Sequence, residues 1–359
     1  MQAVSKKVRN SNLELYRIIV MLLIVAHHYV VNSGLFEKMQ SSDLTINSSF
    51  LYLFGMWGKT GINCFVLITG YFMCKSETTI AKFLKLVLEV IFYKVVIYLA
   101  FVISGIVEFK LPTFIKTFCP ISNIGDGFTT AFILFYLFIP FVNILVHNLN
   151  KKMHLLLILL FLFIYTVLYM IPFFEVRYNY VTWFIVLFLI ASYIRYYPIH
   201  PIVGKEIPWG VVTLLLMLLS SASVYVLKIA GHHPYFFVSD SNAILALCVG
   251  ICSFMYFKDL NLRYSKVINT IGASIFGVLL IHANSDAMRQ WLWKDTLQNI
   301  FWFDSNYCII HAVISVFAVF CICVLFDIIR IKVVEKPFFE SNIYGKLENR
   351  IRKILEGIK

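Results

Sequence analysis

Charged residues are scarce in this sequence. Only 14% of the 359 residues are Asp, Glu, Lys or Arg, whereas ordinary soluble domains carry about 25%. A soluble domain of this length needs polar side chains to cover its surface, and too few are present. The shortage excludes an ordinary soluble enzyme and a disordered chain. There is also no low-complexity segment and no clear internal repeat, which excludes a fibrous repeat protein.

Clusters of metal-ligating residues are also missing from the sequence. The eight cysteines lie mostly inside apolar runs. Cys248 and Cys252 would share a helical face, but no His or carboxylate stands beside them to complete a ligand set. Structural zinc sites need about four convergent ligands. We therefore expect no metal site and interpret the cysteines as small buried residues.

Apolar residues dominate what is present. They make up 60% of the chain, and the mean hydropathy is +0.82. A helix that spans a bilayer needs about 20 mostly apolar residues. The sequence offers about ten such segments, which predicts an all-α polytopic membrane protein. These segments are residues 13–32, 48–74, 83–106, 128–147, 154–174, 179–197, 207–229, 241–257, 268–287 and 308–331.

Lys and Arg are distributed unevenly between the two sides of this ten-span arrangement. With the N-terminus in the cytoplasm, 21 of the 31 basic residues lie inside and 7 lie outside. Cytoplasmic loops of membrane proteins carry such an excess. The distribution predicts cytoplasmic N- and C-termini, and it explains the net charge of +12 without a nucleic acid partner. We divide the chain into a transmembrane domain, residues 1–331, and a basic cytoplasmic tail, residues 332–359.

The first predicted span carries charged and titratable side chains. A charge inside a span costs at least about 2.5–3.5 kcal/mol on insertion scales, so such residues are functional candidates. Arg17 and His28 are eleven residues apart, which places them on one face of a helix, roughly 16 Å apart along its axis. Glu14 lies one turn before Arg17 on that face. The alternative is an interfacial ion pair and a histidine that only bonds a neighbouring helix.

Three segments carry recognisable motifs in order along the chain. Arg17 is followed after ten residues by His28, residues 58–71 read GKTGINCFVLITGY, and residues 269–282 read NTIGASIFGVLLIH. The first resembles the Arg/Lys-x10-His signature of the acyltransferase-3 family, whose integral-membrane enzymes mostly acylate cell-surface and extracellular glycans. The second resembles that family's Gly-x-x-Gly-Val-x-x-Phe-Phe-x-x-Ser-Gly-Tyr segment, with Thr69 in the Ser position. The third resembles its late helix, which ends in Tyr-Leu-x-His.

The resemblance implies an O-acyltransferase of the cell membrane. We expect it to transfer acetyl from acetyl-CoA to a sugar hydroxyl of a surface polysaccharide or its lipid-linked precursor. His28 is the expected general base, because a neutral imidazole can take a hydroxyl proton near neutral pH. Arg17 is expected to orient the donor or bind its phosphates, and Glu14 to hold Arg17. His27 is the alternative base.

The resemblance also suggests residues that bind the donor. Lys82 and Lys85 stand where the family often has an Arg-x-x-Arg pair, thought to contact acyl-CoA. Lys keeps the charge but lacks the bidentate geometry of Arg, and two basic residues at the cytoplasmic start of a helix are an equal alternative. Asn63 is a further candidate beside the acyl path, with helix packing as its alternative. Beyond the CoA donor, the glycan acceptor and the lipid bilayer, we expect no tightly bound cofactor.

Other polar residues fall within predicted spans. Glu89 and Tyr93, four residues apart, are candidates to share a hydrogen bond, and Asp327 and Arg330, three apart, indicate a local ion pair. His282 is interpreted as a hydrogen-bonded core histidine, with a polar pocket beside it as the alternative.

Two other classes of function stay open. Ten spans with buried charge also suit a transporter or flippase for a glycan precursor, although such proteins often contain repeats, and none is evident here. A non-catalytic partner in a glycan-synthesis complex is the second alternative. The sequence does not define the oligomeric state.

Overall fold

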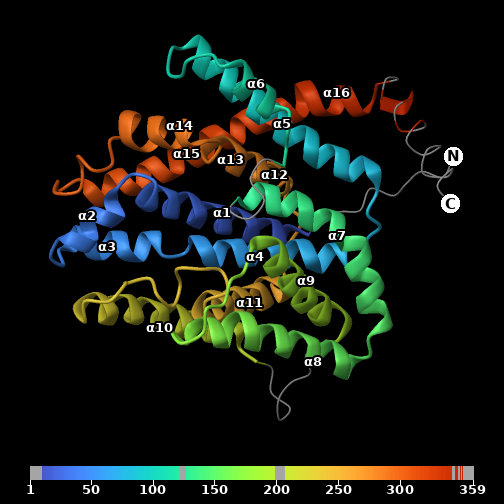
Figure 1. The fold of residues 1–359 in the computed structure, drawn as a ribbon, viewed down its shortest axis with the longest axis horizontal. Coiled ribbons are helices and arrows are strands. Elements are labelled where there is room, and N and C mark those ends of the chain that lie inside the picture. The colour runs from blue at the N-terminus through green and yellow to red at the C-terminus, as the bar shows by residue number, and fades with distance from the viewer. Residues whose placement is uncertain are drawn as a thin grey trace.

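The computed structural model describes residues 10–121, 127–198, 207–341, 344–346, 348 and 350, and this part of the chain is helical without strands (Figure 1). The first helices are α1 (Ser11–Val31), α2 (Leu35–Ser41), α3 (Ile46–Gly55), α4 (Gly58–Met73), α5 (Ile80–Ile103), α6 (Leu111–Thr117), α7 (Phe128–Asn148) and α8 (Lys151–Leu162). They are followed by α9 (Tyr180–Tyr196), α10 (Trp209–Ile229), α11 (Ile244–Asp259), α12 (Lys266–Ala273), α13 (Ile275–His282), α14 (Asp286–Arg289), α15 (Cys308–Arg330) and α16 (Lys336–Phe339).

Helices cover all ten segments that the hydropathy predicts. Among the described residues, seven helical segments are long and apolar enough to cross a membrane: Ser11–Val31, Ile46–Met73, Ile80–Ile103, Phe128–Asn148, Lys151–Met170, Trp209–Ile229 and Cys308–Phe339. The bent pair Lys266–His282 and Asp286–Thr296 would make an eighth. Helices α9 and α11 have 17 and 16 residues and are shorter than a full span. The chain is therefore an all-α, multi-pass membrane protein, and the count of ten stays a prediction.

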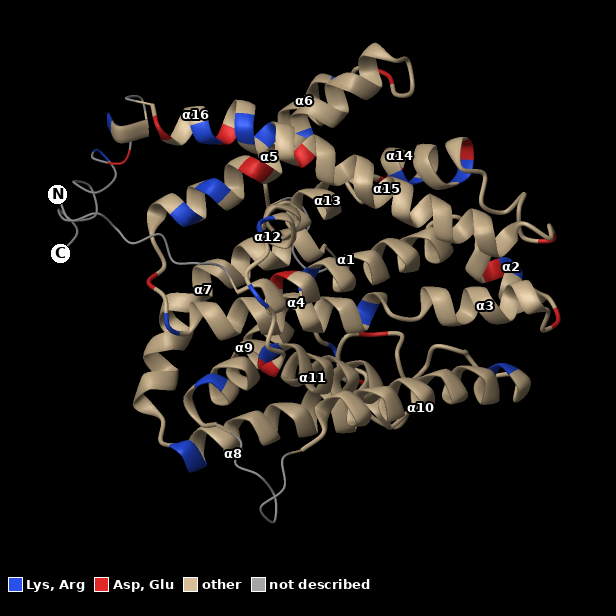
Figure 2. Ribbon diagram, turned by 180° about the vertical axis from the view of Figure 1, so that it is seen from behind, with Lys and Arg blue, Asp and Glu red and all other residues tan. Residues whose placement is uncertain are grey.

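Charged residues gather near helix ends and in connections, and long stretches of helix between them are uncharged (Figure 2). This pattern agrees with helices that cross an apolar layer. The predicted orientation, with cytoplasmic termini, stays a prediction, and residues 1–9 and 351–359 lie outside the described part.

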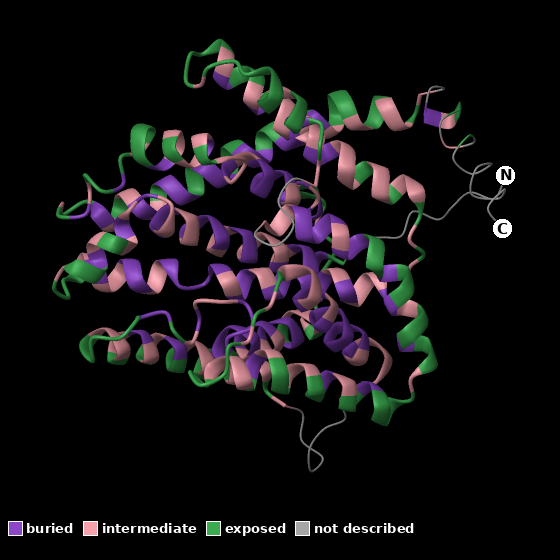
Figure 3. Ribbon diagram, viewed as in Figure 1, coloured by how far each residue is buried: buried purple, intermediate pink, exposed green. Residues whose placement is uncertain are grey.

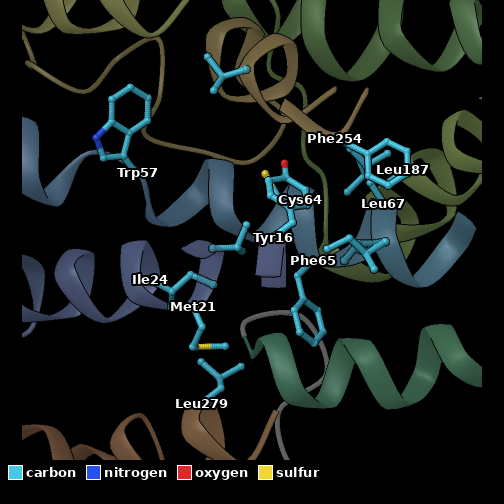
Figure 4. Close-up of a cluster of buried hydrophobic side chains, with 14 of the residues drawn as sticks. Tyr16, Met21, Ile24, Trp57, Cys64, Phe65, Leu67, Leu187, Phe254 and Leu279 are labelled. Carbon is cyan, nitrogen blue, oxygen red and sulfur yellow. The ribbon is translucent and has the colours of Figure 1, made fainter. Parts of the chain in front are cut away.

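The helices separate into an inner and an outer set. In the most apolar stretch of the segment Ile46–Met73, which contains α4, 78% of the residues are buried. In the corresponding stretches of the segments that contain α8 and α10, only 17% are buried, and Figure 3 shows this contrast. The outer helices expose large apolar side chains such as Leu159 and Leu218, as lipid-facing surfaces do. Buried aromatic and aliphatic side chains of α1, α4, α9 and α11 form the core between them (Figure 4).

Two glycines let α1 and α4 approach closely. A Cβ atom on Gly58 would lie 2.2 Å from Cγ of His27, and one on Gly61 would lie 2.7 Å from Cγ1 of Ile24. Real side chains do not tolerate such distances, so only glycine fits at this crossing. The close packing fixes the histidine-bearing half of α1 against the start of α4.

The late predicted span, residues 268–287, is not one continuous helix. A turn at Ser274 separates α12 from α13, and its backbone N–H donates to the Ile271 carbonyl at 2.9 Å. The chain then bends by 93° after His282 before it enters α14. His282 therefore lies at the end of a short inner helix, rather than within a straight span.

The last helix passes the predicted boundary at residue 331. Helix α15 continues through a π-helical turn, Ile331–Glu335, into α16, which ends at Phe339. The division into a 1–331 domain and a 332–359 tail stays a prediction, since residues 342, 343, 347, 349 and 351–359 lie outside the described part.

Candidate active site

His28 lines a cavity of about 550 Å³ that is bounded by seven helices. We call it the His28 cavity. Met21 and Ile24 precede His28 along the same face of α1, so this face forms one wall. The remaining walls come from α4, α5, α13, the end of α14 and the first residues of α7 and α9. They include Lys59, Ile62, Phe65, Val90, Lys94, Phe128, Thr129, Thr130, Tyr180, Leu279, Asn284 and Arg289.

His28 forms a hydrogen-bonded pair with His282, which is buried behind the cavity lining. Nδ1 of His28 lies 2.9 Å from Nε2 of His282, and Nδ1 of His282 lies 2.6 Å from the Val278 carbonyl oxygen. A carbonyl only accepts, so His282 carries its proton on Nδ1 and its neutral Nε2 is an acceptor. His28 therefore donates from Nδ1, which leaves the lone pair on its Nε2. No described residue hydrogen-bonds that nitrogen, so it is available for a substrate.

His27 lies at the edge of the same cavity in a different setting. Its Nδ1 donates to the Gly55 carbonyl oxygen at 2.6 Å, and its ring covers Gly58. The rings of His27 and His28 are 5.7 Å apart, between centroids. His27 thus ties α1 to the junction of α3 and α4, whereas His28 bonds to a second imidazole. Its role as the alternative base stays a prediction.

Three cationic side chains line the His28 cavity, and no Asp or Glu is among the described residues that line it. Nζ of Lys59 donates to the Tyr180 hydroxyl at 2.7 Å, and Nζ of Lys94 donates to the Cys119 carbonyl at 3.0 Å. Arg289 pairs with Asp286, which is outside the lining. The wall therefore presents positive charge, which suits a reaction that develops negative charge on oxygen.

Glu14 and Arg17 lie in the first turns of α1, toward the end of the helix opposite His28. Their side chains form an ion pair of 3.0 Å, as their spacing suggested. Glu14 packs on the backbone of α12, where a Cβ on Gly272 would lie 2.3 Å from its Oε2. The guanidinium of Arg17 lies 6.0 Å from the ring centroid of Phe72. Arg17 is not among the residues that line the cavity, and its role toward the donor stays a prediction.

The other predicted donor-binding residues lie apart from the cavity. Asn63 is fully buried, where its amide accepts from Trp183 Nε1 at 2.9 Å and donates to the Ser241 carbonyl at 2.7 Å. Lys82 and Lys85 are exposed in the first turns of α5. These three positions are compatible with structural roles, and their part in donor binding stays a prediction.

A second set of buried charges lies between α5 and α15. The Arg330 guanidinium bonds to Glu89 at 3.0 Å, Asp327 at 2.7 Å and Glu335 at 2.8 Å. Asp327 also accepts from the Tyr93 hydroxyl at 2.7 Å. We call these five residues the Arg330 cluster. The predicted Asp327–Arg330 pair is confirmed. The expected hydrogen bond between Glu89 and Tyr93 is wrong, because both side chains turn toward α15.

His282 was the residue whose partner the sequence did not reveal. Its interpretation as a hydrogen-bonded core histidine is confirmed, since it is fully buried and bonded at both ring nitrogens. Of the polar residues that follow it, Asn284 lines the His28 cavity, and the alternative of an acceptor-side pocket stays a prediction. The motif that ends at His282 was the available signal, but no spacing rule relates residues 254 positions apart.

Comparison with known proteins agrees with the motifs. The family model described as an acyltransferase domain, that of the acyltransferase-3 family, matches residues 10–328, which include α1 through nearly all of α15. No curated protein and no solved structure matches the chain. The matched range contains His28, His282 and the whole lining of the His28 cavity. The chain therefore belongs to the acyltransferase-3 family and is a membrane acyltransferase.

Proposed function

We propose that this protein transfers an acetyl group from acetyl-CoA to a sugar hydroxyl of a surface polysaccharide or of its lipid-linked precursor, at the plasma membrane. His28 acts as the general base. The observation that carries the proposal is the His28–His282 pair, which leaves Nε2 of His28 without a partner among the described residues, on a side chain that lines the cavity. A base must reach the proton that it abstracts, and an unbonded nitrogen on a residue of the cavity wall supports this role.

The proposed reaction runs in one transfer. Nε2 of His28 takes the proton of the sugar hydroxyl, and the hydroxyl oxygen forms a bond to the acetyl carbonyl carbon. The carbon–sulfur bond then breaks, and the sulfur leaves with the electron pair and takes the proton back from His28. The products are an O-acetyl ester and free CoA.

His282 supports this chemistry by position. When His28 holds the proton, its Nδ1–H still donates to Nε2 of His282, so the hydrogen bond persists in both protonation states. Fixing the tautomer of a catalytic imidazole through its second nitrogen is what the third member of a catalytic triad does. Lys59 and Arg289 add positive charge to the cavity wall, where the thioester oxygen would gain negative charge.

The test compares surface glycan from cells that carry the wild-type protein, no protein, or His28→Ala at matched membrane levels. Mass spectrometry measures a base-labile mass of one acetyl group. We expect the mass in the wild type only, because loss of a general base lowers the rate by about 10²- to 10⁴-fold. His232→Ala is the matched control, since His232 is an exposed histidine outside the cavity lining.

Two results would contradict this assignment. If His28→Ala still adds acetyl at the wild-type level, His28 is not the base, and His27→Ala is the next variant to measure. If acetylation is the same with and without the protein while total surface glycan falls without it, the chain acts in transport of the glycan precursor instead.

A further inference from the structure

A second, smaller pocket lies beside the start of α1, at the other end of this helix from His28. It has a volume of about 380 Å³. Its walls come from the first residues of α1, the end of α4, the end of α9 and the segment that follows α11. We call it the Arg195 pocket, and its polar lining includes Asn10, Ser11, Tyr71, Arg195, Lys258 and Tyr264.

Arg195 is the distinctive group of this pocket. Its Nη1 donates to the Tyr71 hydroxyl at 2.5 Å, and its guanidinium lies 4.4 Å from the centroid of that ring. Its Nε–H is buried and has no hydrogen-bond partner. Within the described ranges, Arg195 forms no ion pair with a carboxylate. A half-buried guanidinium with an unused donor is poised to bind an anion, and a planar fork of N–H groups matches phosphate oxygens.

Lys258 places a second cation in the same pocket. It pairs with its neighbour Asp259, which is more exposed than Lys258 and is not part of the lining. Helix α1 is bonded to the end of α11 at this pocket, because the Asn12 amide donates to the Phe257 and Lys258 carbonyls at 2.8 and 3.0 Å. These hydrogen bonds hold the backbone that carries Lys258 against the first residues of α1.

The two lysines of α5 are less free to bind an anion than Arg195. Nζ of Lys85 forms an ion pair of 2.5 Å with Glu335, and Nζ of Lys82 donates to the Glu77 carbonyl at 2.7 Å. A phosphate would have to compete with these partners. Arg195 has an open donor instead, and Phe72, which lines its pocket, is the ring that Arg17 approaches.

The position of the pocket favours a ligand from the aqueous phase. Its walls belong to α1, α4, α9 and α11, which are inner helices, and not to the outer helices α8 and α10, which are only 17% buried over their apolar windows. A lipid headgroup would meet the outer helices first. A phosphate ester from solution, with a flat ring that can pack on Tyr71, Phe72 or Tyr264, fits the lining better.

We propose that the Arg195 pocket binds a phosphate ester through Arg195 and Lys258, and that this ester is the phosphate-bearing nucleotide end of the CoA donor. The second clause rests on the proposed function. The donor would then span from the Arg195 pocket, past Arg17, to the His28 cavity. Leu13 in one lining and Met21 in the other are eight residues apart on α1, which is about 12 Å of helix.

The test measures binding rather than activity. Purified full-length protein in phosphatidylcholine nanodiscs is titrated calorimetrically with CoA and, separately, with adenosine 3′,5′-bisphosphate, which has the phosphates but no thiol. We expect Arg195→Ala to weaken both by about tenfold or more, because a charge-assisted hydrogen bond is lost. Lys258→Gln should weaken both while leaving the Arg195–Tyr71 contact intact. Lys152→Ala is the matched control and should stay within about twofold of the wild type, since Lys152 is exposed on α8 and does not line the pocket.

The outcomes separate this inference from the proposed function. If folded Arg195→Ala and Lys258→Gln bind the bisphosphate as the wild type does, the Arg195 pocket is not a phosphate site. If binding of phosphatidylglycerol in mixed nanodiscs is lost in Arg195→Ala while the bisphosphate never binds, the ligand is a lipid headgroup and the donor assignment is overturned. If CoA binds through Arg195 but no acetyl is ever transferred, the proposed function fails and the pocket stands.

Discussion

The His28–His282 pair and the Arg330 cluster differ in what their polar atoms are bonded to. In the cluster, three nitrogens of Arg330 each bond to a different carboxylate, and Asp327 and Arg330 are 0% and 6% exposed. In the pair, the hydrogen bonds run from His28 through His282 to the Val278 carbonyl, and Nε2 of His28, a residue that lines the cavity, has no partner among the described residues. Both sets are polar and both lie among apolar helices.

The difference indicates two uses of buried polar groups, a structural one in the cluster and, under the proposed function, a chemical one in the pair. A buried group whose partners are all within the protein holds helices together, and its removal leaves uncompensated charge. A buried group with one open position can bind a substrate. Helix α13 connects the two sets, because Gly277 packs on Asp327 and His282, five residues later, bonds to His28. The cluster thus contacts the helix that carries His282, the partner of the proposed base.

The largest expected effect is on stability, from Arg330→Ala. The substitution leaves the carboxylates of Glu89 and Asp327 buried without their cation, and breaking a buried ion pair in this way costs about 3–5 kcal/mol. Unfolding of the protein in nanodiscs, followed by tryptophan fluorescence, measures the loss. Lys332→Ala, an exposed basic residue just past α15, is the control. If the two variants unfold with the same free energy, the Arg330 cluster does not stabilise the fold.

The next effect is on rate, from His282→Leu. Without an acceptor for Nδ1–H of His28, the tautomer of the base is no longer fixed, and we expect acetyl transfer to fall by about a hundredfold, or about 2.7 kcal/mol in the barrier. His282→Gln keeps an acceptor oxygen and should retain more activity than His282→Leu. Both variants should unfold close to the wild-type temperature. A loss of stability with equal rates in the two variants would show that His282 only packs.

Gly277→Ala is expected to have a smaller effect that reaches both sets. Its Cβ would lie 2.1 Å from Oδ1 and 2.3 Å from Cγ of Asp327, and Asp327 is held by Tyr93 and Arg330 and cannot move aside. Overpacking of this kind costs about 1–3 kcal/mol. Thermal unfolding and acetyl transfer should fall together, because α13 carries His282. Gly345→Ala is the control, since a Cβ there meets nothing within 4 Å; equal behaviour of the two variants would refute the link through α13.

Hydropathy predicted the location of every long helix because the bilayer imposes a length and an apolar composition on each span. Local spacing predicted the Asp327–Arg330 and Glu14–Arg17 pairs, since residues three apart are neighbours on any helix. The break at Ser274 was missed because apolar residues continue on both sides of it.

Contacts between distant helices could not be predicted from the same rules. The bond from His28 to His282 and the bond from Arg330 to Glu89 join residues more than 200 positions apart. Such partners depend on how helices pack, which is set by close approaches such as that of Gly58 to His27. The sequence therefore identified His28 as a candidate, but its orientation required the fold.

The smallest expected effect comes from Tyr180→Phe. The substitution removes the hydroxyl that accepts from Nζ of Lys59 and keeps the ring. We expect acetyl transfer to change by less than about tenfold, because the ammonium stays in the cavity and one hydrogen bond contributes about 0.5–1.5 kcal/mol. Tyr178→Phe is the matched control, since its hydroxyl bonds to Asp240 and it does not line the cavity. If Tyr180→Phe abolishes transfer while Tyr178→Phe does not, the Tyr180 hydroxyl itself takes part in the reaction. The reacting groups would then include a residue of α9 as well as His28 of α1.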